Sequence, residues 1–365
     1  MKILILGGTG AMGTSLVSIL ARKRDNSLFI TSRKRRISQR DNIEYIQGNA
    51  HDNNFLIKLL NDKYYDTIVD FMVYSTEEFK SRVDLFLEHT AQYIYTSSSR
   101  VYANEHKRIT EKSKRILDIC KDDEYLKTDE YALTKARQEN LLLKSKKKNW
   151  TIIRPYITYN VERLQLGVYE KENWLYRALH GRSIIFNKDV ANKFTTLTYG
   201  YDVAIRIADI IGKEAALGEI MHITTSETKK WKDILNLYLD ILEEKTGKRP
   251  TIYWLDTSIN TGKIAGNKYQ IKYDRLYNRS FDSSKIDKIS KNKEKYMSLD
   301  KGLKLCIDSF IDENRKFLDI SWKMQAYMDK IAGERTSLKE ITTLKEKIKY
   351  IICRYTPFLK WKYNL

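Results

Sequence analysis

The first thirteen residues, Met1–Gly13 (MKILILGGTGAMG), decide the fold. An apolar strand, expected at Ile3–Leu6, runs straight into a glycine-rich turn, and an amphipathic helix is expected from Met12 to Arg24. Glycine allows a tight turn and a close approach of backbone to a pyrophosphate, and the N-terminus of the helix adds amide donors and a positive dipole end. We therefore expect this turn to bind a dinucleotide; the alternative is a glycine-rich turn without a ligand. The expected contacts are Gly7, Thr9, Gly10, Ala11, Met12 and Gly13.

Strands and helices alternate through the rest of the first 160 residues. The expected strands are Ser27–Thr31, Ile43–Ile46, Thr67–Met72, Gln92–Thr96 and Thr151–Ile153, and the expected helices are Asn54–Asn61, Glu77–Glu88 and Thr128–Ser145. This alternation predicts an α/β fold, a doubly wound parallel sheet with helices on both faces.

Three parts are expected along the chain. Residues 1–160 form the dinucleotide-binding domain, and 161–320 form a smaller substrate lobe that returns some chain to the sheet. Helices are expected there at Trp174–His180, Asp202–Ile211 and Trp231–Lys245, with short strands at Phe194–Leu197 and Glu219–Ile223. Residues 321–365 form a basic helical tail with ten Lys or Arg against four Asp or Glu.

Composition narrows the functional class. The chain has 365 residues, 42% of them hydrophobic, which is enough for a core, and no apolar run reaches the ~18 residues of a membrane span. The net charge of +19 is compatible with a Lys-rich surface, an anionic substrate, a membrane surface or nucleic acid. Three distant Cys and five His without ligand spacing predict no disulfide framework and no metal. With no signal peptide visible, we expect a cytoplasmic protein.

The end of the second strand favours one dinucleotide over the other. It reads Thr31–Arg36 (TSRKRR) and contains no acidic residue to bond a ribose 2′-hydroxyl. A hydroxyl followed by cations suits a 2′-phosphate, so NADP(H) is favoured over NAD(H), with contacts from Ser32, Arg33 and Lys34. The alternative is that some of these cations only line a loop.

Two further motifs point to proton transfer. Tyr131 and Lys135 stand four residues apart in an expected helix and therefore share one face, where an ammonium favours the phenolate form of an acid/base. Upstream, Ser97-Ser98-Ser99 follows an apolar strand and could donate to a substrate oxygen. The alternative for such a serine cluster is a turn or a helix N-cap.

These motifs, in this order, resemble the extended short-chain dehydrogenase/reductase family, in its NAD-dependent epimerase/dehydratase branch. The resemblance runs from Met1 to about Leu255 and includes Tyr65–Phe71, Arg154-Pro155, Leu197-Thr198 and His222–Thr224. It implies a Rossmann fold and a nucleotide-sugar substrate.

The resemblance also implies residue roles. Tyr131 would be the general acid/base, Lys135 would bind the nicotinamide ribose and tune Tyr131, and Ser98 would hydrogen-bond the reacting oxygen. Further cofactor contacts would come from Asn49, Ala50, Phe71, Met72, Val73, Pro155 and Tyr156, and substrate contacts from Ser99 and Thr158.

Three functions remain open at this point. The first is a sugar-nucleotide epimerase that works through a keto sugar, at C4. The second is an NADPH-dependent keto-sugar nucleotide reductase, which would use the same residues. The third is an RNA- or nucleotide-binding protein on an inactive scaffold, against which the presence of Ser98, Tyr131 and Lys135 argues. The lack of an acid in Ser97–Ser99 argues against 4,6-dehydration, and a charged insertion at 106–123 and Ala103 after Val-Tyr depart from the family pattern.

The tail raises a question of partners. Residues 344–363 interleave apolar and aromatic side chains with Lys, and Tyr350, Ile351, Ile352, Phe358, Leu359 and Trp361 lie among them. Such a stretch could lie on an anionic membrane surface as a peripheral contact. The alternative is a helix that packs on the body or on a partner subunit. We expect a homodimer, and no nucleic-acid partner.

Overall fold

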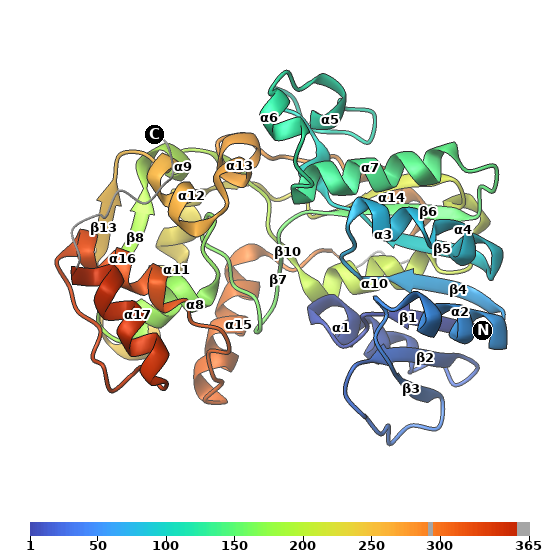
Figure 1. The fold of residues 1–365 in the computed structure, drawn as a ribbon, viewed down its shortest axis with the longest axis horizontal. Helices are drawn as coiled ribbons and strands as arrows, with labels where there is room; N and C mark the ends of the chain where they lie inside the picture. Colours follow the sequence, from blue (N-terminus) through green and yellow to red (C-terminus); the bar gives the residue numbers. More distant parts are fainter. Residues whose placement is uncertain (291–294, 356–365) are drawn as a thin grey trace. The chain divides into compact units, whose positions relative to one another are not determined.

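A computed structural model describes residues 1–290 and 295–355 of the chain. Two compact units divide it, each built from three segments (Figure 1). Unit 1 comprises Met1–Glu162, Phe194–Lys229 and Tyr277–Gly302, and unit 2 comprises Arg163–Lys193, Lys230–Leu276 and Leu303–Leu365. The division into three parts at residues 160 and 320 stays a prediction.

Unit 1 is built around one parallel sheet of seven strands. In the order β11-β6-β5-β4-β1-β2-β3, every neighbouring pair runs parallel. This confirms the doubly wound α/β fold, and β11 is the later chain that returns to the sheet. The strands are β1 (Lys2–Leu6), β2 (Ser27–Ser32), β3 (Ile43–Gln47), β4 (Tyr65–Asp70), β5 (Thr90–Thr96), β6 (Trp150–Pro155) and β11 (Glu219–Ile223).

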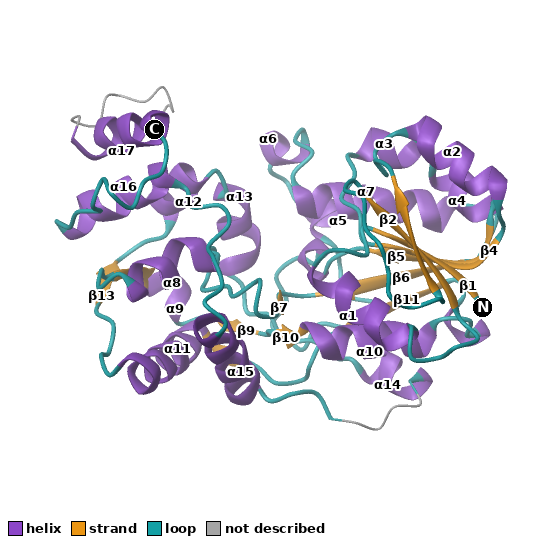
Figure 2. Cartoon of the chain, turned by 90° about the horizontal axis from the view of Figure 1, so that it is seen from below, coloured by secondary structure: helices purple, strands orange, loops and turns teal. Residues whose placement is uncertain are grey.

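Helices cover both faces of this sheet (Figure 2). Because side chains alternate along a strand, Ile3 and Ile5 of β1 face one layer while Leu4 and Leu6 face the other. The first layer contains α1 (Ala11–Leu20), α10 (Gly200–Ile210) and α14 (Ser284–Ile289). The second contains α2 (Asn53–Asp62), α3 (Thr76–Lys80), α4 (Val83–Glu88) and α7 (Tyr131–Lys144).

The strand order creates a switch point beside β1. The chain leaves β1 toward β2 and β3, then crosses to β4 on the other side, where Leu6 pairs in register with Asp70. Ligands of doubly wound sheets bind at the carboxyl ends of the strands at such a point. The glycine turn after β1 and the segment after β4 leave the sheet there together.

The single helix predicted at Glu77–Glu88 is wrong, because the chain forms α3 and α4 with a break at Ser81-Arg82. Arg82 is buried, and its guanidinium donates to the carbonyls of Ala50 and His51 and to Oδ1 of Asn53 at 2.6 Å. These bonds place Arg82 outside helical geometry, at φ −132°.

The remaining elements of unit 1 are short. They are the 3-10 helices η1 (Ser99–Val101) and η2 (Glu214–Ala216), the helices α5 (Ile116–Ile119) and α6 (Asp123–Leu126), and the strands β7 (Thr158–Tyr159), β9 (Phe194–Thr195) and β10 (Thr198–Tyr199). The two-residue strand β12 (Lys229–Lys230) stands at the end of its second segment. Helix α5 belongs to the charged insertion and α6 begins at its last residue. Arg115 ties the insertion to α7 by donating to the Ala136 carbonyl and to Glu139.

Unit 2 pairs two parallel strands, β8 (Ile184–Asn187) and β13 (Ile252–Leu255). Its helices are α8 (Lys171–Leu179), α9 (Lys188–Ala191), α11 (Trp231–Thr246), α12 (Ile259–Ala265), α13 (Lys268–Gln270) and a π-helical turn, η3 (Ile271–Arg275). Helix α15 (Leu299–Asp312) starts in the last segment of unit 1.

The described part of the tail contains two helices, α16 (Trp322–Ala332) and α17 (Leu344–Tyr355), joined by a loop. The buried Tyr350 anchors α17, because its hydroxyl donates to Asp329 at 2.7 Å and its ring packs with Trp322 and Ala326. Phe358, Leu359 and Trp361 lie outside the described residues. Within residues 1–290 and 295–355, no helix has the length and apolar character needed to cross a bilayer.

Candidate active site

The glycine turn after β1 is closely packed by backbone. Gly7 has φ +71°, a left-handed conformation that favours glycine, and its N–H donates to the Thr31 hydroxyl at 3.3 Å. A Cβ on Gly13 would lie 2.6 Å from the Gly8 backbone, so only glycine lets α1 pack on the turn. At Gly10, which caps α1, a Cβ would meet nothing nearer than a carbonyl oxygen at 3.5 Å. Close packing therefore fixes the backbone at Gly13, whereas the space beside Gly10 is unfilled. A turn that binds a pyrophosphate needs both features.

The other residues of the predicted turn lie around this cradle. Thr9 and Met12 are half-buried, and Ala11 is the first residue of α1. Met72 reaches the turn, since its Sδ would lie 3.2 Å from a Cβ on Gly7. Phe71 is half-buried beside it, whereas Val73 is 59% exposed.

The predicted adenosine contacts gather at the ends of β2 and β3. The backbone of Gly48 bonds the Ser32 carbonyl at 2.9 Å, which brings Asn49 next to the cationic segment. Asn49 is exposed and Ala50 is buried. The buried Ser32 hydroxyl donates to the Lys34 carbonyl at 2.8 Å, and this leaves the side chains of Arg33 and Lys34 exposed.

Lys135 joins α7 to the end of β5. It is buried, its Nζ donates to the Thr96 carbonyl at 2.7 Å, and it lies 6.0 Å from the centroid of the Tyr131 ring. Tyr131 is the first residue of α7 and is half-buried. Among the described residues, its phenolic oxygen has no hydrogen-bond partner, so it is available to an incoming hydroxyl.

The serine cluster divides its three side chains between different tasks. Ser98 accepts the N–H of Arg100 at 3.2 Å and so caps η1, which packs against α7. Within residues 1–290 and 295–355, its own hydrogen finds no acceptor. Ser97 donates to Glu139 at 2.5 Å, and the fully buried Ser99 donates to the Arg154 carbonyl at 2.8 Å. The cluster thus serves as an N-cap and still leaves one hydroxyl, that of Ser98, able to donate.

Buried charges surround Lys135. Burial lowers the pKa of Lys135 to about 8, although the carboxylates of Asp70 and Glu139 act in the opposite direction. Burial also raises the pKa of Asp70, despite hydrogen bonds from the Tyr93 hydroxyl at 2.7 Å and the Met72 N–H at 2.9 Å. Asp70 had no role assigned from the sequence, and the available signal was that it is the one charged residue of the strand expected at Thr67–Met72.

Glu139 forms a second buried group that the sequence analysis did not single out. It is fully buried and binds Arg154 through two bonds of 2.7 and 2.6 Å, Arg115 at 3.2 Å and the Ser97 hydroxyl. Burial alone would raise the pKa of Glu139, but Arg154, the Ser97 hydroxyl and Arg115 together outweigh it and hold that pKa below its usual value. Its position four residues after Lys135 was the available signal, because Tyr131, Lys135 and Glu139 share one face of α7.

Arg154 extends this group to a histidine. Its Nη1 donates to the hydroxyl of Tyr102 at 2.5 Å, and that hydroxyl lies 2.6 Å from Nε2 of His222. The Asp282 carbonyl only accepts, so Nδ1–H of His222 donates to it at 2.8 Å, and in the neutral ring Nε2 then accepts the Tyr102 hydrogen. Burial lowers the pKa of His222, which favours this neutral form.

Arg100 is a further residue that sequence reasoning missed. Its guanidinium lies 5.2 Å from the Tyr131 ring centroid and pairs with Glu130 at 2.5 Å. Glu130 caps α7 by accepting the Ala132 N–H at 2.8 Å. In the sequence, the position of Arg100 directly after the serine cluster was the signal that it belongs to the site. Cations thus approach the Tyr131 ring both from α7 and from η1.

The predicted contacts after β6 are largely buried. Pro155 ends β6, and the ring of Tyr156 lies 5.0 Å from that of Phe281. Thr158 is buried in β7, which pairs with β10. Of the predicted substrate residues, Ser99 faces the interior and Thr158 is 8% exposed. In the described part of the chain, no three His, Cys, Asp or Glu side chains gather as a metal site would require.

Solved structures share this fold. A UDP-glucuronic acid 4-epimerase from Bacillus cereus, in complex with NAD, is 19% identical and has a TM-score of 0.63 over 87% of this chain and 100% of its own. A dTDP-glucose 4,6-dehydratase from Bacillus anthracis, in complex with NAD, is 16% identical, with a TM-score of 0.65 over 87% and 98%. A UDP-N-acetylglucosamine 4-epimerase from Methanobrevibacter ruminantium, in complex with UDP-N-acetylmuramic acid, is 16% identical, with a TM-score of 0.66 over 86% and 98%.

No curated protein matches the chain. A family model does match, over residues 3–189, which contain the glycine turn, the serine cluster and the Tyr131–Lys135 helix. The family is one of enzymes, and the extended short-chain dehydrogenase/reductase fold expected from the sequence is the one observed. The chain belongs to the NAD dependent epimerase/dehydratase family.

Proposed function

We propose that the chain is an NAD(P)-dependent sugar-nucleotide epimerase. It would invert the configuration of the hydroxyl-bearing carbon C4 of the sugar, through a keto-sugar intermediate. The observation that carries this proposal is the α7 face, where the phenol of Tyr131, whose oxygen has no hydrogen-bond partner among the described residues, lies near a buried ammonium anchored to the end of β5. Two of the solved structures that share the fold are described as 4-epimerases of UDP-linked sugars.

Tyr131 would take the proton from the sugar hydroxyl as the carbon loses hydride. A nicotinamide cofactor held by the glycine turn and Lys135 would supply the hydride acceptor and donor, and inversion requires that the hydride return to the opposite face of the keto sugar. Ser98 would donate its free hydrogen to the reacting oxygen, and the ammonium of Lys135 would stabilise the phenolate of Tyr131. On return of the hydride, Tyr131 gives the proton back, so no net oxidation occurs.

A panel of nucleotide sugars tests this proposal. The protein is incubated with UDP-glucuronic acid, UDP-N-acetylglucosamine and UDP-glucose, and product stereochemistry is read by NMR. Tyr131→Phe should lower turnover by about 10²–10⁴-fold, because it removes the acid/base. The control Tyr64→Phe alters an exposed tyrosine and should leave turnover unchanged. Full activity in Tyr131→Phe would refute the mechanism.

The cofactor is proposed to be NADP(H) rather than NAD(H). The exposed cations Arg33 and Lys34 support this, since they stand at the end of β2 with no acidic residue among them. The double variant Arg33→Gln, Lys34→Gln should weaken NADP binding about tenfold or more and leave NAD binding nearly unchanged. Arg24→Gln, an exposed arginine beyond α1, is the matched control. Equal affinity of the wild type for both cofactors contradicts the assignment.

A keto-sugar nucleotide reductase is the second candidate, and the same two cations favour it, because a reductase consumes NADPH. The nucleotide-sugar assay separates the two functions. An epimerase gives a new stereoisomer without net loss of NADPH absorbance, whereas a reductase consumes the cofactor in proportion to product.

We also propose that α17 contacts an anionic membrane surface. Leu344, Ile348, Ile351 and Tyr355 recur at helical spacing and are 40–73% exposed, and Lys345 is exposed beside them. Vesicles that contain phosphatidylserine should float with the full chain, and Ile348→Glu with Ile351→Glu should abolish flotation. Glu88→Gln on α4 is the control. Equal flotation of wild type and double variant would contradict the contact.

The expected homodimer and the cytoplasmic location are proposals as well. Light scattering of the purified chain gives the mass in solution, and a monomer would exclude the dimer. Fractionation of cells tests the location.

A further inference from the structure

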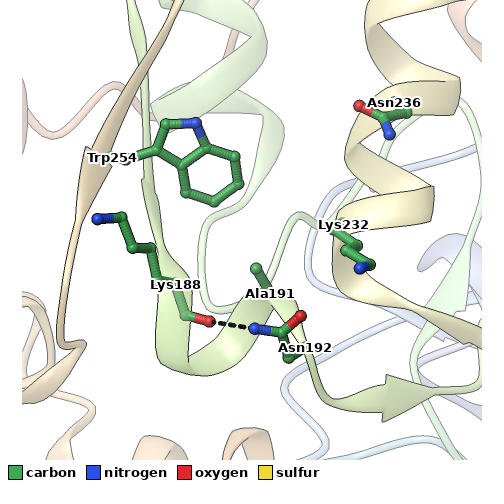
Figure 3. A pocket seen from close by; sticks show the side chains of 6 residues that line it. All are labelled: Lys188, Ala191, Asn192, Lys232, Asn236 and Trp254. Atoms are coloured by element: carbon green, nitrogen blue, oxygen red, sulfur yellow. Dashed lines mark hydrogen bonds between the residues drawn. The ribbon is translucent and has the colours of Figure 1, made fainter.

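Unit 2 contains an open pocket of about 370 Å³ that the proposed reaction does not use (Figure 3). It is lined by Lys188, Ala191, Asn192, Lys232, Asn236 and Trp254. All six residues belong to the segments 163–193 and 230–276 of unit 2. The volume is at the lower end of the range of small-molecule sites, which suits a ligand of about one ring.

Three elements bring this lining together. Lys188 begins α9 and Asn192 follows it, while Trp254 comes from β13. Lys232 and Asn236 stand four residues apart on α11 and so share one of its faces. Figure 3 shows Trp254 and Lys188 on one side and the two α11 side chains on the other.

The polar groups at the pocket are largely unused. Among the described residues, the ammonium of Lys232, the amide of Asn236 and the indole N–H of Trp254 have no hydrogen-bond or ion-pair partner. Asn192 uses only its amide nitrogen, which donates to the Lys188 carbonyl at 3.3 Å. Lys188 is already paired with Asp256 at 2.7 Å, so Lys232 is the cation available to an anion.

Trp254 supplies the apolar surface. Its indole is 40% exposed although it is large and aromatic, and it is supported by the buried ring of Phe186 at a centroid distance of 6.0 Å. An exposed indole with a polar tip is typical of binding surfaces. Its flat face suits the C–H face of a sugar ring, and the neighbouring amides suit ring hydroxyls, since each amide both donates and accepts.

We propose that this pocket binds a monosaccharide that carries a carboxylate or a phosphate. The ring lies on Trp254, Asn192 and Asn236 bond its hydroxyls, and Lys232 pairs with the negative group. None of the lining residues belongs to the Tyr131 group of unit 1, and the inference does not depend on the proposed epimerase function.

Calorimetric titration of the full chain tests the proposal. The probes are glucuronic acid and glucose 1-phosphate, which distinguish a carboxylate from a phosphate, and neutral glucose. At least one anionic sugar should bind saturably, and glucose at least tenfold more weakly. Lys232→Gln and Trp254→Leu should each weaken binding about tenfold. Lys248→Gln, which removes an exposed lysine of unit 2 outside the pocket, should bind like the wild type.

A second variant separates this site from the proposed active site. Tyr131→Phe should bind the anionic sugar as the wild type does. Circular dichroism should show each variant folded, because Lys232, Lys248 and Trp254 are exposed and Tyr131→Phe removes only a hydroxyl from a half-buried ring. No saturable binding, binding of glucose equal to that of both acids, or unchanged affinity in Lys232→Gln would each overturn the proposal.

Discussion

Glu139→Gln is the substitution whose effect the structure defines best. The carboxylate is fully buried and holds Arg154, Arg115 and Ser97 at once. Glutamine keeps the shape and one acceptor oxygen. Its NH₂ group, however, would face a donor of Arg154 or Arg115, and Arg154 would remain buried without a counter-charge.

The expected loss in the free energy of unfolding is large for a substitution that replaces one carboxylate oxygen by an NH₂ group. Removal of one partner from a buried ion pair costs about 3–5 kcal/mol, more than the pair itself contributes relative to an apolar replacement. For a unit of this size, that corresponds to a melting temperature lower by roughly 6–20 °C. Urea unfolding followed by circular dichroism gives the free energy, and calorimetry gives the temperature.

Low pH should remove the difference in stability between the wild type and Glu139→Gln. The pKa of Glu139 is lower in the folded state than its ordinary 4.5, so its contribution is fully present above that pH and is lost as the pH falls below it. Wild type and Glu139→Gln should therefore converge in stability in acid. Glu88→Gln, at the exposed end of α4, is the control and should change stability by less than about 0.5 kcal/mol. A Glu139→Gln protein within 1 kcal/mol of the wild type at neutral pH would refute this account, since ~3 kcal/mol is the minimum expected.

Four other substitutions have defined outcomes. In the wild type, the pKa of Lys135 is about 8 in the folded state and about 10.5 in the unfolded chain. Between these pH values the unfolded chain holds a proton that the folded protein has lost, so the free energy of unfolding should rise with pH by at most ~1.4 kcal/mol per pH unit. Lys135→Met should lack this rise when urea unfolding is measured at several pH values. Gly13→Ala should destabilise or prevent folding because its Cβ would collide with Gly8, whereas Gly10→Ala should melt like the wild type but lose affinity for the dinucleotide in a titration. Tyr102→Phe leaves two buried partners of its hydroxyl unpaired and should lower the unfolding free energy by about 1–3 kcal/mol in urea, with no change counting against the hydrogen-bond assignment.

The sequence by itself determined most of the local elements and the parallel, doubly wound class of the sheet. Strand and helix periodicity predicted six strands of the parallel sheet and a short strand at Glu219–Ile223, because a buried parallel strand is apolar throughout and a covering helix is apolar on one face. Only the structure placed that last strand in the sheet, as β11 beside β6. The glycine pattern and the four-residue spacing of Tyr131 and Lys135 are local in the chain, so they could be recognised without a structure. The break between α3 and α4 could not, since it depends on bonds from Arg82 to a loop some thirty residues earlier.

Only the tertiary structure decided which polar side chains are held and which are free. Three adjacent serines look alike in sequence, yet Ser97 and Ser99 are bound by Glu139 and by the Arg154 carbonyl, and Ser98 alone keeps a hydrogen to donate. The same holds for Asp70, which is an ordinary acid in sequence and a buried neighbour of Lys135 in the fold. The physical reason is that burial and pairing, which set the charge and reactivity of a group, arise between strands and helices that are distant along the chain.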